Sequence, residues 1–325
     1  MNTSTRSGNS TVSAQPDALP GAPPVAVPNP VPSASVLLLR DGPPDAQGHQ
    51  LEVLLQRRAD SMAALGGMHV FPGGKVDPQD HAMAASADML DIFPGTPAGP
   101  APGTVPVTEA HSLAVWQVAA LRELFEEAGV LLAVDGQGEW PAAAMLPILR
   151  AQVLAGADWP SLLRTHGLRW CTAALVPFTR WITPLQPAIG RHRFDTLFFL
   201  ARLPAGQTVQ EDTHAGAEST ESLWLHPRDA MEQYQAGRME LVPPQLMGLA
   251  QLARHATVQS AWLEAAARPA PTVLPHTFSL AGVRHMCYPG DPDHPVRERA
   301  MPGPTRLRLQ EGRFEPLEGF AGWFA

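Results

Sequence analysis

The sequence predicts an α+β fold in which helices cover a mixed β-sheet. Aliphatic runs of strand-like composition alternate with segments whose apolar residues recur at helical spacing. We expect strands at residues 35–39, 51–56, 130–134, 172–181, 194–200 and 223–225. We expect helices at residues 111–128, 141–154, 159–166, 228–236 and 244–267. The first two strands would form a hairpin, and the later, more apolar strands would complete the sheet.

The two ends of the chain differ in composition from the middle. Residues 1–32 are mostly Ser, Pro, Ala, Val and Gly with almost no large apolar side chains. Burial there cannot offset the entropy lost on ordering, so a disordered N-terminal tail is expected. We expect a folded domain over residues 33–254. Residues 255–325 would form a C-terminal extension packed on that domain, with a hairpin at 306–317.

Composition favours an enzyme of the cytoplasm. The 325 residues carry a net charge of −8, which argues against a nucleic-acid partner and requires local basic groups for any anionic substrate. No apolar run reaches about 18 residues, and the N-terminus lacks the order of a signal peptide, so no membrane association is expected. Cys171 and Cys287 are too few for a disulfide framework and are expected to be reduced. A monomer or a homodimer would suit this composition.

The helix expected at 111–128 carries a concentrated acidic face. Glu123, Glu126 and Glu127 fall within roughly a 100° arc, while the opposite side is apolar. Two of these carboxylates repel each other at i, i+4 spacing, and all lie near the negative end of the helix dipole, before a C-cap at Gly129. A bound divalent cation would relieve both effects. The alternative is an ordinary solvated face.

The string RELFEEAGV at 122–130 resembles the second half of the Nudix box, Gly-x5-Glu-x7-Arg-Glu-U-x-Glu-Glu-x-Gly-U, where U is a bulky aliphatic residue. FPGGKVDPQD at 71–80 resembles the first half, with Asp80 where the family has Glu. Asp80 and Arg122 are separated by 41 residues, where the box has seven. The box is therefore split by an insertion at about 81–110, which is rich in Pro and Gly and is expected to run over the surface.

Most of residues 33–254 resembles the coenzyme A diphosphatase-like branch of the Nudix hydrolases, the Nudix motif 19-like proteins, whose box is interrupted in this way. The coenzyme A signature of that branch is present in part, in Leu54, Leu55, Arg58, Gly67 and FPGG. The resemblance implies a Nudix α/β/α sandwich with a helical insertion at about 141–168. It also implies metal-dependent hydrolysis of coenzyme A or an acyl-coenzyme A at the diphosphate. The alternatives are hydrolysis of ADP-ribose or another nucleoside diphosphate compound, and a catalytically silent nucleotide-binding module.

The same resemblance implies the residues of the site. Glu126 and Glu127 would bind Mg²⁺, with Mn²⁺ possible, and Glu123 would act as a further ligand or as the base. The carbonyl group of Gly74 could contribute to the metal site. Arg122 is expected to hold a carboxylate by a bidentate pair.

Further residues are candidates for binding substrate or metal. Arg58 and Arg57 could clamp phosphate, and Gly73 and Gly74 would let the loop backbone approach closely. Three acidic residues are possible additional ligands or bases, with loop capping or plain solvent-facing charge as the alternative: Asp80, Glu218 and Glu221.

Overall fold

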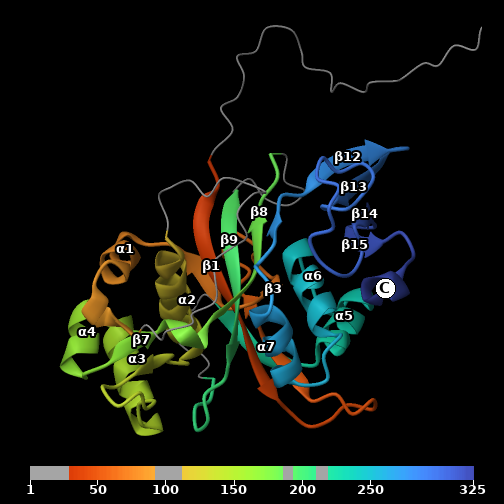
Figure 1. Cartoon of the computed structure of the whole chain (residues 1–325). Coiled ribbons are helices and arrows are strands. Elements are labelled where there is room, and N and C mark those ends of the chain that lie inside the picture. Colours follow the sequence, from red (N-terminus) through yellow and green to blue (C-terminus); the bar gives the residue numbers. More distant parts are fainter. Residues whose placement is uncertain (1–28, 92–111, 186–192, 210–218) are drawn as a thin grey trace, which may run out of the picture.

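The fold is built around one mixed sheet between two helical layers, as Figure 1 shows. The computed structural model describes residues 29–91, 112–185, 193–209 and 219–325. Residues 1–28 of the tail expected at 1–32, and residues 92–110 of the insertion expected at about 81–110, lie outside these residues; Val31 and Pro32 of the expected tail belong to the first strand instead. The strands of the main sheet are β1 (Val31–Asp41), β2 (Leu51–Arg58), β3 (His69–Val70), β4 (Gly73–Lys75), β8 (Val176–Ile182), β9 (Phe194–Arg202), β10 (Ser219–Leu225) and β11 (Thr272–Val273).

The order of the main sheet is β10-β2-β1-β9-β8-β11, with β3 beside β2 and β4 beside β1. The hairpin expected between β1 and β2 is confirmed by antiparallel pairs such as Leu39 with Val53. The central pair β1 and β9 runs parallel, and β8 pairs antiparallel with β9. The sheet is therefore mixed. β4 pairs with the start of β1, which places the Gly-Gly segment at one end of the central strands.

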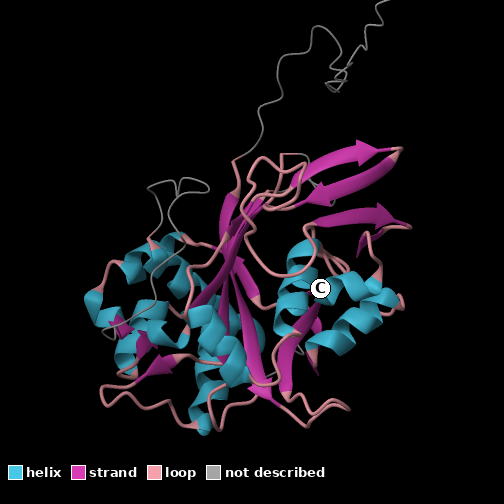
Figure 2. Cartoon of the chain, turned by 45° about the vertical axis from the view of Figure 1, so that its right-hand side comes forward, coloured by secondary structure: helices cyan, strands magenta, loops and turns pink. Residues whose placement is uncertain are grey.

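Both faces of the sheet are buried. Successive side chains of β1 point to opposite faces, so this strand contributes to two separate hydrophobic clusters. Leu37 and Leu39 belong to one hydrophobic cluster, and Val36 and Leu38 belong to the other. The first cluster includes residues of α5 (Pro227–Gln235), α6 (Pro243–Leu252) and α7 (Val258–Ala266). The second includes the apolar face of α2 (Leu113–Ala128). Figures 1 and 2 show these helices on opposite sides of the sheet, which confirms the α+β sandwich.

Several smaller elements lie around α2. They show that the first part of the insertion, expected to run over the surface, is packed against the core. They are α1 (Pro78–Ala84), α3 (Leu146–Leu154), α4 (Trp159–Thr165), β5 (Leu90–Asp91), β6 (Ala133–Val134), β7 (Arg169–Cys171) and three 3₁₀ turns at Ala87–Met89, Ala143–Met145 and Thr172–Ala174. Residues 81–91 are not a surface excursion, because Met83, Met89 and Leu90 are buried in the cluster of α2. β5 also pairs with β7. The apolar side chains of this segment, rather than the Pro-Gly composition further on, decide its path.

The single helix expected at 244–267 is two helices, α6 and α7. The break falls at Thr257, whose side chain accepts a hydrogen bond from the backbone N–H of Ser260 at 3.3 Å. The hydroxyl oxygen of Ser260 accepts a hydrogen bond from the backbone N–H of Thr257 at 3.4 Å, and this reciprocal capping box starts α7. The apolar spacing continues through the break, so periodicity alone did not reveal it.

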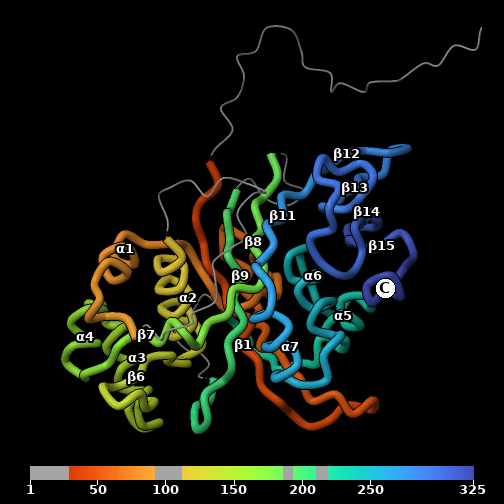
Figure 3. The backbone as a smooth tube through the Cα atoms, viewed as in Figure 1, coloured from red at the N-terminus to blue at the C-terminus, as the bar shows by residue number. Residues whose placement is uncertain are grey.

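The C-terminal extension adds a second, antiparallel sheet. Its strands are β12 (His276–Leu280), β13 (Val283–Cys287), β14 (Arg306–Gln310) and β15 (Arg313–Pro316), followed by a 3₁₀ turn at Phe320–Phe324. The expected hairpin is confirmed, and Glu311 and Gly312 take the positive φ values of its tight turn. Figure 3 shows this sheet, in blue, beside α5 and α6. No helix among the described residues is long and apolar enough to cross a membrane.

Candidate active site

The acidic face of α2 lies against the Gly73–Gly74 segment of β4. The helix ends at Gly129, which has a φ of 68° and donates its N–H to the carbonyl oxygen of Phe125. Its apolar face packs on the main sheet, so the glutamates of its last two turns are turned toward β4 and α1. The two halves of the split box therefore meet in space.

The two glycines are required by the closeness of this contact. A Cβ atom on Gly73 would lie 2.3 Å from the carbonyl oxygen of Ala34, and one on Gly74 would lie 2.3 Å from Oε1 of Glu123. Gly73 has a φ of 154°, and its N–H donates to Oε2 of Glu127 at 2.7 Å. A side chain at Gly73 would push β4 away from β1, and one at Gly74 would displace the Glu123 carboxylate.

Arg122 connects four parts of the site through one buried guanidinium group. Its Nε and Nη2 donate to the two oxygens of Asp80 at 2.8 and 3.0 Å, in the bidentate arrangement. Its Nη1 donates to Glu123 and Glu126, both at 2.9 Å. Its Nη2 also reaches the carbonyl oxygen of Lys75 at 3.0 Å. Burial by itself disfavours the charged guanidinium, but the hydrogen bonds to Asp80 and the nearby glutamates outweigh it and raise the pKa of Arg122.

Asp80 occupies a supporting position behind Arg122. Its side chain is 0% exposed, and its Oδ2 accepts a hydrogen bond from the backbone N–H of Asp77 at 2.8 Å. Asp77 in turn caps the start of α1, so the pair forms a capping box. Both carboxylate oxygens of Asp80 thus bind protein donors, and this residue does not line the cavity described below.

Two residues of the helical segment at 141–168 hold the end of α2, and sequence reasoning did not find them. Nε1 of Trp159 donates to Oε1 of Glu126 at 2.8 Å. Arg150 donates to the backbone carbonyl oxygens of Glu126 and Glu127, both at 3.2 Å, and so satisfies acceptors that the last helical turn leaves open. No sequence spacing relates these donors to α2, because α3 and α4 reach it only through the tertiary fold.

The expected phosphate-binding arginines lie in different surroundings. Nη1 of Arg58 lies 3.9 Å from Oε1 of Glu127, and its Nε donates to the carbonyl oxygen of Ala64 at 3.2 Å. Arg57 instead forms an ion pair with exposed Asp60 at 2.7 Å. Glu221 is exposed on β10 in register with Arg57 and does not line the cavity of α2. Glu218 lies outside the described residues.

A cavity of about 650 Å³ opens where these elements meet. Its polar wall contains the cations Arg58, Lys75 and Arg122, the carboxylates of Asp77 and Glu123, and the backbone of Gly73 and Gly74. Lys75 was not singled out from the sequence, although it directly follows the second glycine. The cavity therefore presents both signs of charge, as a metal-bridged phosphate requires.

Of the three glutamates of α2, Glu123 lines this cavity, and Glu126 and Glu127 do not. The Glu123 carboxylate, with the Glu127 carboxylate next to Gly73, fits a divalent cation. The space that a Cβ of Gly74 would fill is next to the Glu123 carboxylate, and Glu127 is held beside it by Gly73. Over the described ranges, no three acidic, histidine or cysteine side chains converge on one point. Magnesium does not need such a cage, since it keeps several waters and takes one or two carboxylates together with phosphate oxygens of the substrate.

Comparison with known proteins gives the family. A family model described as the NUDT19 Nudix domain matches residues 31–252. The chain is 32% identical over 289 residues to human (Homo sapiens) acyl-coenzyme A diphosphatase NUDT19, covering 77% of this chain and 73% of that protein. It is 28% identical over 307 residues to the protein of the same name from Gallus gallus, covering 81% and 79% of the two chains.

A solved structure agrees with these sequence matches. The crystal structure of a NUDIX hydrolase from Alicyclobacillus acidocaldarius is similar with a TM-score of 0.57 and 29% identity, over 75% of this chain and 99% of that chain. Nudix hydrolases generally require a divalent metal ion. With both halves of the box assembled at one cavity, the chain belongs to the NUDT19 Nudix domain family and is a Nudix hydrolase.

Proposed function

We propose that this chain hydrolyses the diphosphate of coenzyme A or of an acyl-coenzyme A, with Mg²⁺, or Mn²⁺ in its place, at the carboxylates of α2. The relatives named acyl-coenzyme A diphosphatase support the choice of substrate. The observation that carries the proposal is the cavity wall where Glu123, Arg58 and the Gly73–Gly74 backbone meet. A chain with a net charge of −8 needs such a local site to accept an anionic diphosphate.

The reaction adds one water molecule across the P–O–P linkage. The water oxygen bonds to one phosphorus atom, the bridging P–O bond on that atom breaks, and the bridging oxygen leaves on the other phosphate. Coenzyme A would give 3′,5′-ADP and 4′-phosphopantetheine, or its acyl derivative. A bound divalent cation would neutralise phosphate charge and favour deprotonation of the attacking water.

The protein side chains have separate tasks in this proposal. Glu127 and Glu126 would serve as metal ligands, because Gly73, Arg122 and Trp159 hold their carboxylates in fixed positions. Glu123 lines the cavity and would be either a further ligand or the base that accepts the proton of the water. Arg122 lines the cavity as Arg58 and Lys75 do, but its donors are engaged by carboxylates, so Arg58 and Lys75 are the cations proposed to screen the phosphates.

Substrate profiling with product identification tests the proposal. Purified protein with Mg²⁺ is supplied with coenzyme A, octanoyl-coenzyme A, ADP-ribose, NADH and a dinucleoside polyphosphate. We expect the highest kcat/KM on one of the two coenzyme A compounds, with 3′,5′-ADP as a product. Preferential cleavage of ADP-ribose would refute the substrate while leaving the Nudix chemistry. Absence of turnover on every compound, with nucleotide still bound, would indicate a silent binding module.

A further inference from the structure

A second cavity continues from the candidate active site and is apolar. It measures about 210 Å³ and shares seven lining residues with the first cavity, namely Ala63, Ala64, Leu65, Phe194, Thr196, Phe198 and Gln245. The two cavities are therefore parts of one depression. None of the described residues that line the second cavity is charged. A phosphate or a metal ion would find no charged partner among these residues.

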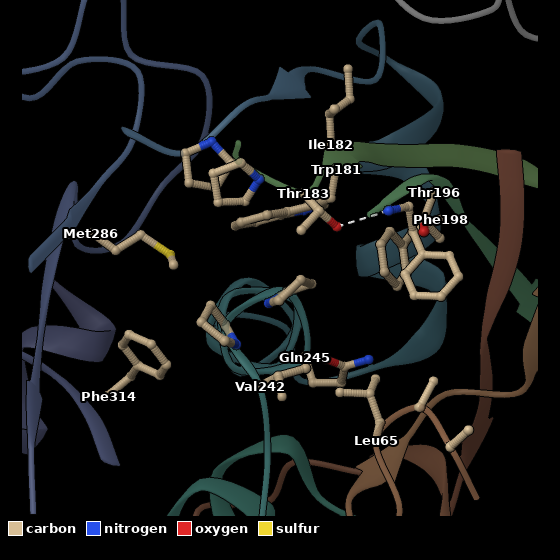
Figure 4. A pocket seen from close by; sticks show the side chains of 17 residues that line it. Leu65, Trp181, Ile182, Thr183, Thr196, Phe198, Val242, Gln245, Met286 and Phe314 are labelled. Atoms are coloured by element: carbon tan, nitrogen blue, oxygen red, sulfur yellow. Dashed lines mark hydrogen bonds between the residues drawn. The ribbon is translucent and has the colours of Figure 1, made fainter. Parts of the chain in front are cut away.

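Figure 4 shows how the walls of this apolar cavity are arranged. Leu65, Phe198 and Gln245 lie on one side of it, and Met286 and Phe314 lie at the other end. Trp181 and Ile182 form a further wall. Met286 belongs to β13 and Phe314 to β15, so the far end is built by the C-terminal sheet, beyond the residues that match the family model.

Two features of the shared wall indicate a ligand. The side-chain oxygen Oε1 of Gln245 is buried and accepts no hydrogen bond, and the residue is only 6% exposed. A buried acceptor without a donor is costly, and since Oε1 has almost no accessible surface, a turn of the side-chain amide would bring it to the cavity, where a ligand N–H group can donate to it. Leu65 has a φ of 57°, a conformation unfavourable for leucine that is common where a loop clamps a ligand.

We propose that the apolar cavity binds the acyl chain of an acyl-coenzyme A, and that Gln245 accepts a hydrogen bond from an amide N–H of the pantetheine arm. This inference rests on the proposed function, since it requires the diphosphate to lie in the first cavity. Along the depression, the charged wall, the Gln245 side chain and the apolar end follow one another. The diphosphate, the pantetheine amides and the acyl chain follow one another in the same order in the substrate. The C-terminal sheet thereby takes part in selecting the acyl chain.

The volume of the cavity sets an expected chain length. A protein cavity of about 150 Å³ accommodates the six carbons of benzene, so this cavity has room for roughly eight carbons. Each methylene that enters should lower the Kd by about fourfold. Affinity should rise from acetyl- to octanoyl-coenzyme A and then level off, because a longer chain would extend into solvent.

The first test measures binding and not turnover. Calorimetry on metal-free protein compares coenzyme A with acetyl-, butyryl-, octanoyl- and palmitoyl-coenzyme A, so that hydrolysis cannot obscure the result. We expect octanoyl-coenzyme A to bind at least tenfold more tightly than coenzyme A. Equal affinity across the series would overturn the inference, while cleavage of coenzyme A by the same protein after Mg²⁺ is added would leave the proposed function standing.

Variants at the Met286 end of the apolar cavity test whether the acyl chain lies there. Met286→Trp fills the cavity and should abolish the preference for octanoyl-coenzyme A while changing the Kd of coenzyme A by less than twofold. Met286→Ala enlarges it and should move the preferred length upward, which keeps the test valid if the tryptophan variant does not fold. Met301→Ala is the matched control, because Met301 is a similarly buried methionine of the extension that does not line this cavity.

A variant of Gln245 tests the amide contact. Gln245→Leu removes the acceptor and leaves an apolar side chain that is one atom shorter, and should raise the KM of coenzyme A and of octanoyl-coenzyme A by about five- to tenfold each, with kcat unchanged. The Kd of 3′,5′-ADP, which lacks the pantetheine arm, should stay the same. If Met286→Trp or Gln245→Leu weakened 3′,5′-ADP as much as coenzyme A, the depression would bind the nucleotide end, and the inference would be wrong.

Discussion

At the scale of single residues, the site depends on how Arg122 distributes its hydrogen bonds. One guanidinium group holds buried Asp80 and also binds Glu123 and Glu126 of its own helix. Glu127 has a different partner, the N–H of Gly73. The three glutamates therefore do not form one equivalent cluster, and their substitutions should differ in effect.

Glu127→Gln should lower kcat by about a hundredfold to a thousandfold and leave the melting temperature nearly unchanged. The neutral amide can still accept the hydrogen bond from Gly73, but it no longer carries the charge that a metal-bound diphosphate requires. Steady-state kinetics at saturating Mg²⁺, with a thermal melt, measure both. Glu139→Gln, an exposed change in the same chain, is the control. Turnover of Glu127→Gln at the wild-type rate would exclude Glu127 from the site.

The sequence revealed one side of this site and not the other. The acidic arc, the glycines and Arg122 follow from local spacing, since they belong to two short strings. Trp159 and Arg150 bind the end of the same helix, yet no spacing or composition marks them. Their role depends on α3 and α4 folding back onto α2, which only the tertiary structure shows. Gln245 escaped notice for the same reason.

At the scale of elements, the insertion in the box consists of two unlike parts. Residues 81–91 form the end of α1, a 3₁₀ turn and β5, and they contribute Met83 to the core. The segment that follows is rich in Pro and Gly. The sequence prediction treated both as one loop because the Pro-Gly content dominated the average, although the methionines and Leu90 already signalled burial.

We expect a substitution in the first part to destabilise the protein much more than a deletion in the second. Met83→Ala should cost about 2–5 kcal/mol of stability, because Met83 is 1% exposed and its loss leaves a cavity. Deleting residues 96–103 should cost less than about 1 kcal/mol, because their sequence contains no large apolar side chain. Urea unfolding of each variant measures these values. A large loss from the deletion would show that this stretch contributes to the core.

At the scale of the whole molecule, the C-terminal sheet is joined to the main domain by buried contacts. Tyr234 of α5 donates its hydroxyl to the carbonyl oxygen of Phe314 at 3.2 Å and accepts from the N–H of Phe314 at 2.7 Å. Trp181 of the main sheet packs edge to face on Tyr288. The sequence predicted one hairpin here but no role for the extension, because its docking surface is spread over α5, α6 and β8.

Alkaline pH should loosen this junction. Burial raises the pKa of Tyr234 from 10.0 to about 12. The fold favours the protonated phenol, so this contribution to stability is complete below pH 10 and is lost as pH rises through about 12. Tyr234→Phe should lower stability at neutral pH by about 1–3 kcal/mol and flatten the dependence between pH 10 and 12. Denaturant unfolding at several pH values checks this, with the wild-type protein as the reference. An unchanged slope in Tyr234→Phe would contradict the prediction.

The meeting of Asp80 with Arg122 also bears on how such enzymes are recognised in genomes and how they can be engineered. Because that contact, and not chain continuity, brings the halves of the motif together, a search for the uninterrupted string would pass over this chain. The interval between residues 92 and 111 is, for the same reason, a place to graft a reporter domain. A receptor grafted there would act on the Asp80 side of the Asp80–Arg122 pair only by way of residues 81–91, which are packed in the core between the graft and the site.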